Sequence, residues 1–544
     1  MSVGLGRLWR TVRWLRAGQV FARMRFAVVH PQADNRAPPA VRAAARDWIH
    51  PPEREASLVG PTRWRFLSEE HDLEDIGWDA PDVALLWRYN QHYFDDLNAK
   101  GAAARCEWHR ALLNRWRDEN PPGRVTAWAP YPTSLRIVNW VKWFVGGQSP
   151  DPAWMQSLAT QARWLARRIE WHLLGNHLFA NAKALVFAGL WFQGTEAEQW
   201  LTAGLAILER ELPEQILADG GQFERSPMYH ALALEDVLDL INLIQSRSVS
   251  DTTANRLLPV LRRNAGTMLR WLRCMLHPGG TLARFNDSAD GIGPAPIAIE
   301  TYAAALGVTA EAAPSQGVTL LEPSGYVRMA RADTIALLDT APIGPDYLPG
   351  HAHADTLSFE LALGGRELIV NRGTSVYGTG ERRQIERGTS AHSTVQIGCH
   401  DSSEVWAGFR VGRRARVTRQ TIDGWSVEAS HDGYVHLRGC PIHRRRWSLE
   451  EDGMLVDDTV DPASIEEAVV RFHLAPGLGL QVDGSCWRVE DCTGAVLASI
   501  SIEAGGTGSR EQWLHAERFG LLVAAETLVV PLEANRRARV RWRW

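Results

Sequence analysis

Apolar residues recur three and four positions apart along the chain from about residue 80 to about residue 310. This spacing is typical of amphipathic helices, and glycines interrupt it at intervals of about 20 to 30 residues. Successive helices with short connections and little strand signal indicate an array of helical hairpins or a helical toroid. The clearest predicted helices are Ser134–Val145, Trp154–Leu174, His177–Phe192, Ala197–Leu217 and Tyr229–Gln245.

After about residue 315, apolar positions alternate with polar ones, which is typical of half-buried strands. Asp-Gly turn signals recur between these segments and indicate antiparallel hairpins. The sequence therefore predicts a multidomain chain, an α-helical domain followed by an antiparallel β-sandwich, joined near residues 313–317. The clearest predicted strands are Thr334–Leu338, Thr356–Leu363, Glu367–Asn371, Thr394–Ile397, Trp425–Ala429, Val469–His473 and residues 537–544.

Composition narrows the function classes without naming one. The 544 residues are 45% apolar and 22% charged with a net charge of −4, so neither disorder nor a general attraction to nucleic acid is expected. The sequence lacks helix-turn-helix, zinc-finger, GxGxxG, P-loop, GxSxG and HExxH patterns. The 24 tryptophans are unusual, because indole rings stack on sugar rings as well as filling cores.

The first thirty residues form a basic segment with six arginines and no acidic residue. Leu5, Leu8, Trp9 and Val12 recur there at helical spacing. A basic amphipathic helix of this kind either docks on its own domain or lies on an anionic membrane surface. Neither a secretory signal peptide nor a membrane span is expected, because no long apolar stretch follows. We expect a cytoplasmic or inner-membrane-peripheral protein, with the periplasm as the alternative.

Two polar clusters stand at predicted helix starts. In Gly175–Leu185 (GNHLFANAKAL), Asn176 and His177 lie at the mouth of an otherwise apolar helix. Asn176 is there either an N-cap or a ligand contact. In Asp219–His230 (DGGQFERSPMYH), Tyr229 is either a core phenol or a general acid-base group. Arg225 and His230 beside it would favour the second reading by stabilising a phenolate.

Two arginine-containing segments have equally open interpretations. Arg136 shares a predicted helix face with Asn139, between Trp128 and Trp140, and either belongs to a structural network or contacts a ligand. Arg410 begins a strip of arginines that is either a solvated basic edge or an anion-binding surface.

A pair of histidines precedes the predicted strand Thr356–Leu363. Alternation along a strand would place His351 and His353 on one face, as a catalytic pair or a metal site requires. His392 would add a third imidazole, with Asn371 as an oxygen ligand. Two histidines satisfied at a strand end are the simpler interpretation.

These clusters, in this order, resemble those of the heparinase II/III-like polysaccharide lyases. The resemblance is strong from about residue 85 to about residue 420 and looser beyond. It implies an incomplete (α/α) toroid over residues 81–315 and an antiparallel β-sandwich over residues 316–544, with residues 1–80 packed on the toroid. The segment Leu86–Leu97 further resembles members associated with bacterial surface-polysaccharide loci. The other resembling stretches are Gly350–Leu361, Leu368–Tyr377 and Thr389–Val395.

The reaction of that family is β-elimination at a uronic acid of an acidic polysaccharide. The resemblance implies that Asn176 and His177 bind the carboxylate and stabilise the intermediate that forms when the proton leaves. It makes Tyr229 a proton donor or base and His351 the partner group. The resemblance also implies that Trp128, Arg136 and Trp140 line subsites on the toroid and that Tyr377 supplies a second phenol. Glu224, Arg225, His230 and Arg410 are further candidate substrate contacts.

Some relatives hold a structural zinc with two histidines and a carboxylate. His353 and His392 match the histidine places, whereas Asn371 stands where the carboxylate is expected. An amide does not ionise and is a weaker zinc ligand than a carboxylate. The reaction itself requires no cofactor.

Two other function classes stay open on the sequence. A glycan-binding factor with little or no catalysis in surface-polysaccharide assembly would have no need of Asn176, Tyr229 and His351 together. A glycoside hydrolase on the same scaffold would need two carboxylates flanking the bond, for which Glu224 and Asp287 are the candidates. The oligomeric state is not predicted.

Overall fold

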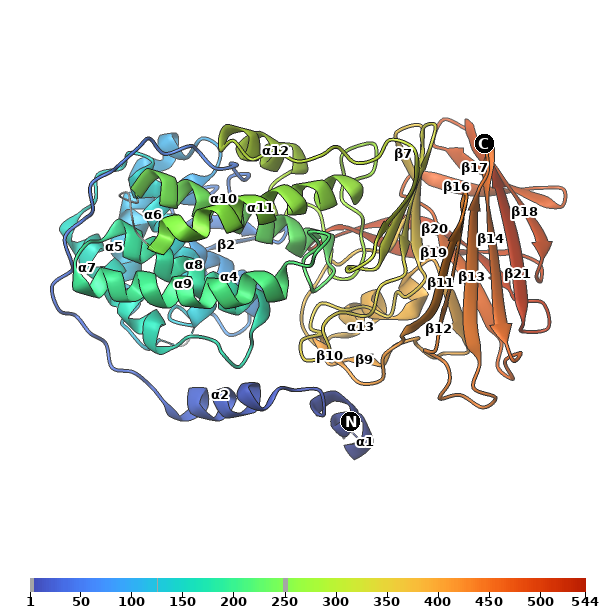
Figure 1. Ribbon diagram of the computed structural model, residues 1–544, viewed down its shortest axis with the longest axis horizontal. Coiled ribbons are helices and arrows are strands. Elements are labelled where there is room, and N and C mark those ends of the chain that lie inside the picture. Colours follow the sequence, from blue (N-terminus) through green and yellow to red (C-terminus); the bar gives the residue numbers. More distant parts are fainter. Residues whose placement is uncertain (1–3, 125, 248–252) are drawn as a thin grey trace.

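Helices fill the amino-terminal half and strands the carboxy-terminal half of the computed structural model, which describes residues 4–124, 126–247 and 253–544 (Figure 1). The change falls between α12, which ends at Ala305, and β3, which begins at Gly317. The predicted fold class, helical first and antiparallel β second, is confirmed. The prediction succeeds because the signal is local. Apolar residues with a period of 3.6 lie on one face of a helix, whereas apolar residues with a period of 2 lie on one face of a strand.

The helical half is organised around α8 (Gly175–Trp191), whose residues are buried on nearly every side. It packs against α6, α9 and α10. A helix that is apolar all round lies inside a protein, and its neighbours cover it. The other helices are α1 (Leu5–Val12), α2 (Ala17–Val28), α3 (Leu73–Ile76), α4 (Leu85–Tyr93), α5 (Cys106–Glu119), α6 (Pro130–Val145), α7 (Pro152–Arg167), α9 (Thr195–Gln215), α10 (Pro227–Arg247), α11 (Thr253–Cys274), α12 (Pro296–Ala305) and α13 (Glu381–Arg387).

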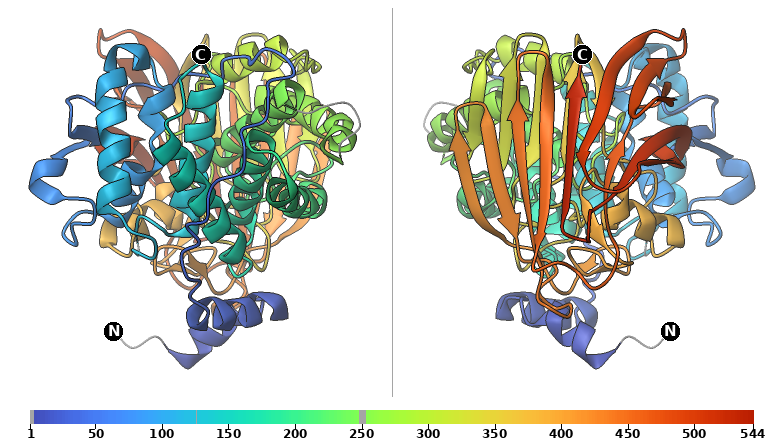
Figure 2. Two further views of the ribbon diagram at one scale, coloured as in Figure 1. Left: turned by 90° about the vertical axis from the view of Figure 1, so that its left-hand side faces the viewer. Right: turned by 90° about the vertical axis from the view of Figure 1, so that its right-hand side faces the viewer.

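The strands of the second half form three main antiparallel sheets. An eight-stranded sheet, ordered β11-β12-β13-β14-β21-β18-β17-β16, is the layer farthest from the helices (Figures 1 and 2). The smaller sheets, β3-β4-β5-β6-β7 and β19-β20-β15-β8, lie between it and the helical half. One apolar core is shared by all three sheets, which is the packing of a sandwich.

The strand bounds are as follows: β1 (Arg63–Phe66), β2 (Glu69–Asp72), β3 (Gly317–Leu321), β4 (Tyr326–Arg331), β5 (Thr334–Asp339), β6 (Phe359–Leu363), β7 (Arg366–Ile369), β8 (Val395–Ile397), β9 (Val405–Trp406), β10 (Arg410–Val411), β11 (Val417–Asp423), β12 (Ser426–His431), β13 (Ile442–Leu449), β14 (Gly453–Asp461), β15 (Ala468–His473), β16 (Leu478–Asp483), β17 (Cys486–Asp491), β18 (Val496–Ala504), β19 (Ser509–Arg518), β20 (Leu521–Pro531) and β21 (Arg537–Arg543).

Two predicted boundaries are wrong. The predicted helix Trp154–Leu174 ends at Arg167, because Arg168 already has non-helical backbone angles, with φ of −126° and ψ of 27°. The predicted strand Thr356–Leu363 begins only at Phe359, because Leu357 has φ of 62°, a left-handed conformation that a strand does not continue through.

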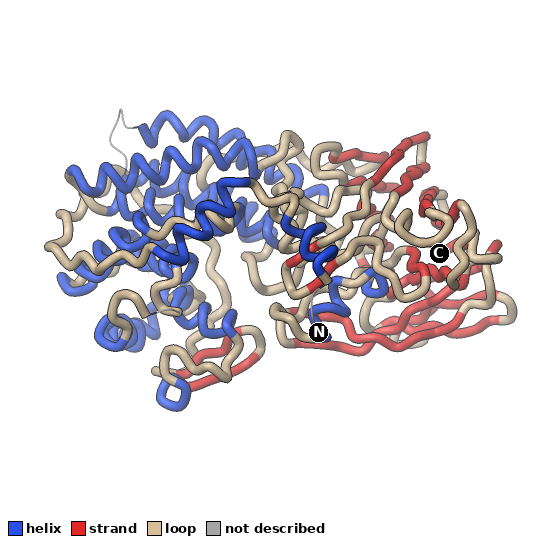
Figure 3. Tube along the Cα trace, turned by 90° about the horizontal axis from the view of Figure 1, so that it is seen from below, coloured by secondary structure: helices blue, strands red, loops and turns tan. Residues whose placement is uncertain are grey.

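The basic amino-terminal segment bridges both halves instead of packing on the helical half alone (Figure 3). Arg7 and Arg10 of α1 pair with Glu404 in the strand half, with Arg10 Nη2 2.8 Å from Glu404 Oε1. Arg16 pairs with Glu214 of the helical half at 2.6 Å. The expected docking of residues 1–80 on the toroid is therefore wrong for α1, because its carboxylate partner lies in the β half.

No helix in the described ranges is both long and apolar enough to cross a membrane.

Candidate active site

A cleft of about 1360 Å³ lies where the helical and strand halves meet. Asn176, His177 and Tyr229 line it from the helical half. His351 and Tyr377 line it from the strand half. Residues that are far apart in the chain thus face one space, as a polysaccharide-binding site with polar groups at its centre requires.

Local structure positions the helical-half residues. Gly175 begins α8 with φ of 52°, and a Cβ there would clash with Leu348 and lie 2.9 Å from Glu224 Oε1. Only glycine fits this position, so the first turn of α8 is held close against the cleft wall. Asn176 and His177 occupy that turn, and among the described residues none hydrogen-bonds the Asn176 amide. That amide is free for a ligand, so the sequence-based alternative of an N-cap is not realised.

Three aromatic side chains form the centre of the site. Tyr229 Oη and Tyr377 Oη lie 3.0 Å apart, within hydrogen-bond distance. The Tyr229 ring packs against the His351 ring, with 3.9 Å between the ring centres and 31° between the ring planes. Tyr229 lies in the first turn of α10, whereas Tyr377 lies in the loop after β7, so the contact between the two phenols joins the two halves. The two phenols and the imidazole therefore lie together at one place in the cleft, where all three can contact the same sugar of a bound ligand.

Both phenols are held in the protonated form. Burial raises the pKa of Tyr229 well above 10, and the nearby Tyr377 adds to the effect. Burial likewise raises the pKa of Tyr377. The predicted stabilisation of a Tyr229 phenolate by Arg225 and His230 is therefore wrong. Those two side chains point away, and Tyr229 rests as a proton donor.

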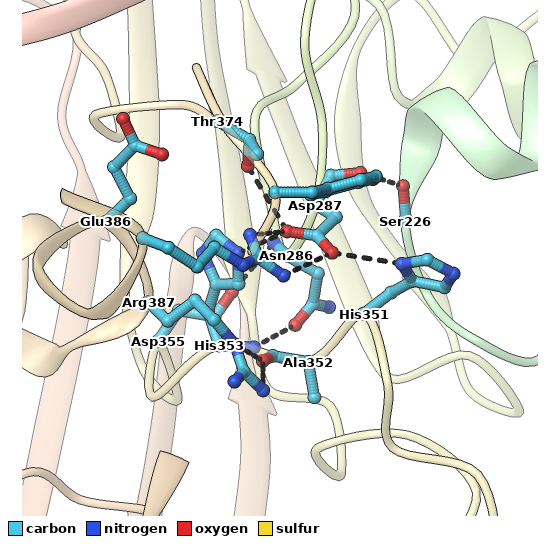
Figure 4. Close-up of polar contacts among 12 residues, drawn as sticks. Ser226, Asn286, Asp287, His351, Ala352, His353, Asp355, Thr374, Glu386 and Arg387 are labelled. Atoms are coloured by element: carbon cyan, nitrogen blue, oxygen red, sulfur yellow. Dashed lines mark hydrogen bonds and ion pairs between the residues drawn. The ribbon is translucent and has the colours of Figure 1, made fainter. Parts of the chain in front are cut away.

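Asp287 contacts both His351 and His353 and fixes their orientation (Figure 4). Its Oδ2 lies 2.9 Å from His351 Nδ1, and its Oδ1 lies 2.8 Å from His353 Nε2. Arg383 forms an ion pair with the same carboxylate, and its Nη2 donates a hydrogen bond to Oδ2 at 2.7 Å. Burial alone would raise the pKa of Asp287, but Arg383 and the histidines hold it well below 3.8. The Asp287 carboxylate therefore stays ionised and fixes the ring of His351.

This arrangement corrects two sequence-based expectations. His351 and His353 lie in the loop before β6 and not on a strand, so they meet through Asp287 and not through alternation. Asp287 is fully buried and saturated by its partners, so it cannot flank a glycosidic bond with Glu224 as a hydrolase pair. Sequence reasoning weighed Asp287 only for that role. It missed the hydrogen bond between Asp287 and His351, and it missed Arg383. The available signal was an aspartate between Asn286 and Ser288, directly after the apolar Phe285.

His177 has a carboxylate partner of its own. Its Nδ1 lies 3.2 Å from Glu170 Oε1, while about a third of the side chain stays exposed to the cleft. Burial lowers the pKa of His177, but the Glu170 charge outweighs this effect and the pKa is raised. The ring also packs on Tyr131, with 4.5 Å between centres. His177 is therefore a cation at the cleft wall below its raised pKa.

Three predicted substrate contacts are wrong because they belong to the helical core. Arg136 is fully buried, donates to Gln161 Oε1 at 2.9 Å and stacks 3.9 Å over the Trp116 ring. Trp128 and Trp140 are also buried there. Of the 24 tryptophans, the described residues place only Trp48 and Trp143 on the cleft. Most of the indoles fill cores.

Three further predicted contacts lie outside the cleft. Arg225 is buried and donates from Nε to the Ser324 carbonyl at 3.0 Å. His230 is fully buried, with Nε2 3.0 Å from the Met268 carbonyl, and burial lowers its pKa to about 3. Arg410 is exposed and stacks over Trp406 instead of lining the cleft. Glu224 does line the cleft, with Oε2 3.4 Å from His351 Nε2.

The residues at the expected zinc position do not make a structural zinc site. His353 and His392 approach with 5.3 Å between ring centres, and His353 Nδ1 and His392 Nε2 lack hydrogen-bond partners. Asn371 Oδ1 is occupied by His392 Nδ1 at 3.0 Å. The described residues contain no group of three or more His, Cys, Asp or Glu side chains arranged for a metal. Structural zinc takes four ligands, most of them thiolate, imidazole or carboxylate, so this donor set is too small.

Comparison with known proteins agrees with the fold. Residues 96–297 match the family described as Heparinase II/III N-terminus, and residues 313–543 match Heparinase II/III-like, C-terminal. A heparin-sulfate lyase of Bacteroides stercoris is 24% identical over 380 residues, 60% of this chain and 56% of that protein. One of Pedobacter heparinus is 26% identical over 390 residues, 60% and 58% of the two chains. The chain spans little more than half the length of these relatives.

A crystal structure of heparinase III has the same fold. It superposes with a TM-score of 0.71 at 17% identity and covers 99% of this chain and 93% of that one. The two sequence matches together extend over both halves, and each half has the expected architecture. This chain belongs to the heparinase II/III-like family.

Proposed function

We propose that this protein is a polysaccharide lyase that cleaves a uronic-acid-containing glycan by β-elimination. The observation that carries the proposal is the meeting of Tyr229, Tyr377 and His351 over one position of the cleft, with His351 held by Asp287. β-Elimination needs a base for the C5 proton and an acid for the leaving oxygen on C4, both in contact with the same sugar.

The hydrogen bond to Asp287 sets the role of His351. With the Nδ1 proton donated to Asp287, Nε2 carries a lone pair toward the cleft. Nε2 removes the C5 proton, the C5 electron pair forms the C4–C5 double bond, and the C4–O bond breaks. Glu224, 3.4 Å from Nε2, stabilises the imidazolium that results.

Tyr229 supplies the second proton transfer. It is protonated at rest, and its hydroxyl donates to the departing C4 oxygen as that bond breaks. Tyr377, 3.0 Å away, hydrogen-bonds the phenolate that remains. Asn176 and His177 lie on the cleft wall to bind the uronic carboxylate, where the amide and the imidazolium stabilise the charge that develops after the C5 proton leaves.

Two features support an acidic bacterial surface glycan as the substrate. The segment Leu86–Leu97 resembles members associated with surface-polysaccharide loci, and part of it lines the cleft. The relatives described above are named as lyases of heparin sulfate, which is an acidic polysaccharide. We place the protein in the cytoplasm or at the inner membrane, where such glycans are assembled.

The experiment is digestion of a panel of uronic-acid-containing glycans. A lyase gives a C4–C5 unsaturated sugar that absorbs in the ultraviolet, without incorporation of oxygen from labelled water. Tyr229→Phe should lower turnover about a hundredfold, because it removes only the hydroxyl. A saturated product with water-derived oxygen would reject the lyase, and full activity in Tyr229→Phe would reject its role. Binding without turnover by the unaltered protein would favour the glycan-binding alternative.

A further inference from the structure

The cations of the cleft are already neutralised by carboxylates of the protein. Arg54 Nη2 lies 2.7 Å from Glu235 Oε2. Lys183 Nζ lies 2.6 Å from Asp236 Oδ1 and 2.5 Å from Asp239 Oδ2. The described lining contains four lysines and arginines, and each has such a partner: Arg54, Lys142, Lys183 and Arg382.

Carboxylates outnumber these cations along the same wall. The described lining contains six acidic residues: Glu53, Glu69, Asp95, Glu224, Glu235 and Asp236. A glycan sulfate approaching Lys183 would meet Asp236 beside it, and the ammonium would have to leave a close ion pair. The negative sulfate and the negative carboxylate would repel each other in the partly desolvated cleft, which opposes binding. The ion pairs of Lys183, at 2.5–2.6 Å, are also costly to break.

The arginines that might have formed a sulfate-binding strip lie elsewhere. Arg410 is outside the cleft, and Arg414 pairs with Asp346 at 2.5 Å. His177 of the described lining also has a carboxylate partner, Glu170, but about a third of its side chain is exposed to the cleft, with the neutral Asn176 beside it. The reacting position therefore offers one exposed cation, which is enough to bind one ligand carboxylate.

We infer that this cleft selects a polysaccharide of sparse negative charge, one carboxylate per uronic acid and no sulfate, in contrast to the heparin-sulfate substrates named for its relatives. The inference rests on the proposed lyase function for the presence of a uronic acid. The neighbouring sugars are neutral, and they contact an aromatic lining that includes Trp48, Trp143 and Tyr131.

The test is binding of matched glycans that differ only in sulfation. Chondroitin against chondroitin sulfate, and heparosan against heparan sulfate, are titrated against the Tyr229→Phe variant, so that affinity is measured without turnover. In each pair for which binding is detected, we expect the unsulfated glycan to bind at least tenfold more tightly than the sulfated one. Equal or tighter binding of the sulfated member, or no binding of any unsulfated uronate chain, overturns the inference.

A charge variant sharpens the test. Glu235→Gln or Asp236→Asn leaves Arg54 or Lys183 with one carboxylate fewer, so the affinity for the sulfated chain relative to the unsulfated one should rise at least threefold. Glu451→Gln is the matched control, because it frees Arg331 outside the cleft with the same change of net charge. An unchanged ratio in folded cleft variants, or an equal rise in the control, overturns the inference.

The failure of the proposed function is seen separately. If no glycan gives an unsaturated product with the unaltered protein, the lyase proposal fails, whatever the binding ratios are. If unsaturated products form faster from the sulfated chains, the lyase stands and the charge selectivity is overturned.

A second surface carries an independent inference. Helices α1 and α2 lie on the underside of the molecule (Figure 3). Several of their large apolar side chains are exposed. Leu5, Trp9, Phe21 and Val28 are 86%, 65%, 67% and 77% exposed. Arg7, Arg10 and Arg16 fasten the helices to the body through Glu404 and Glu214.

The charge of this surface specifies its partner. Arg13, Arg23 and Arg25 have no acidic partner within ion-pair distance in the described structure, and the first thirty residues contain no acid. The geometry points to an anionic lipid bilayer as the partner of α1 and α2, with indole and phenyl rings at the headgroup level and arginines on the phosphates.

Sedimentation with lipid vesicles tests this surface. We expect binding to vesicles of phosphatidylcholine with phosphatidylglycerol and at least tenfold weaker binding to phosphatidylcholine alone. The double substitution Trp9→Ser with Phe21→Ser should weaken binding at least tenfold, whereas Ile465→Ser with Val482→Ser, on exposed apolar residues of the β half, should not. Equal binding to both vesicles, no binding, or insensitivity to the first pair overturns this inference.

Discussion

At the scale of single residues, the site depends on a carboxylate that never touches the substrate. Asp287 is fully buried and holds His351, His353 and Arg383 in place. Its position explains why a loop histidine, far from any strand, has one defined ring orientation. It also means that removal of this carboxylate leaves the Arg383 guanidinium buried without a counter-charge.

We therefore expect Asp287→Asn to lower both stability and turnover. Breaking a buried ion pair costs about 3–5 kcal/mol, measured as the free energy of unfolding in urea. Because the pKa of Asp287 is held well below 3.8, its stabilising contribution is present above that unfolded-state pKa and is lost as the pH falls through the folded-state pKa. Glu451→Gln, which removes an exposed partner of Arg331, should leave stability nearly unchanged. Unaltered stability in Asp287→Asn would contradict the assigned role.

The raised pKa of His177 predicts the pH dependence of substrate binding. Below the folded-state pKa the ring is cationic and pairs with the uronic carboxylate, and above it this attraction is lost. The same linkage means that His177 stabilises the fold below its unfolded pKa of 6.5 and stops doing so as the pH rises through the folded-state value. His177→Gln should weaken binding roughly tenfold at low pH and abolish the dependence. A dependence that survives in this variant would assign it to another group.

Asn371 makes zinc retention an informative measurement. We expect the purified protein to hold less than one zinc per chain and to keep its melting temperature when a chelator is added, because the donor set offers two imidazoles and an amide that is already bonded. Stoichiometric zinc whose removal lowers the melting temperature would show that Asn371 serves as a ligand after all.

At the scale of elements, the cleft is built from two helix starts and a loop. α8 brings its first turn against the loop before β6 because Gly175 has no side chain, and the first turn of α10 places Tyr229 on the same cleft. The elements themselves were predictable from the sequence, since apolar spacing of 3.6 and 2 residues reflects which face of each element is buried. The ends of the elements were less predictable, because the left-handed conformation of a residue such as Leu357, before β6, has no signal in the local sequence pattern.

Gly175→Ala tests the close approach of α8. The new methyl group would strain a backbone at φ of 52° and also press on Leu348 and Glu224, so both stability and turnover should fall. Gly194→Ala is the matched control, because Gly194 precedes α9 with φ of 97° but has open space around it. We expect both variants to unfold at lower urea concentration, and only Gly175→Ala to lose turnover, by about tenfold or more. Equal turnover in the two would deny the role of this contact.

At the scale of the whole molecule, the proposed reaction depends on the interface between the halves. Tyr229 belongs to the helical half and His351 to the strand half, and their rings meet only when the halves are docked. Neither half by itself contains both of the proposed proton-transfer groups. The amino-terminal helices also fasten the two halves, through Glu214 on one side and Glu404 on the other.

The proposed mechanism makes Tyr229 and His351 act on one transition state, so the effects of their substitutions should not add. Tyr229→Phe and His351→Ala should each lower turnover about a hundredfold, and the double variant should be little worse than the more damaged single variant. Turnover is measured in variants with unchanged melting temperatures. Losses that multiply would mean that the two residues act in separate steps.

The sequence alone determined the order of helices and strands, the fold class and the motifs that mark the cleft. It did so because periodicity, turn residues and motif spacing are properties of neighbouring residues. Only the tertiary structure decided which polar residues act there. Asp287 meets His351 across 64 positions of the chain. Arg136, by contrast, looks like a ligand contact in sequence and lies in the helical core. Burial and partnership are set by residues distant in the chain, and no local pattern records them.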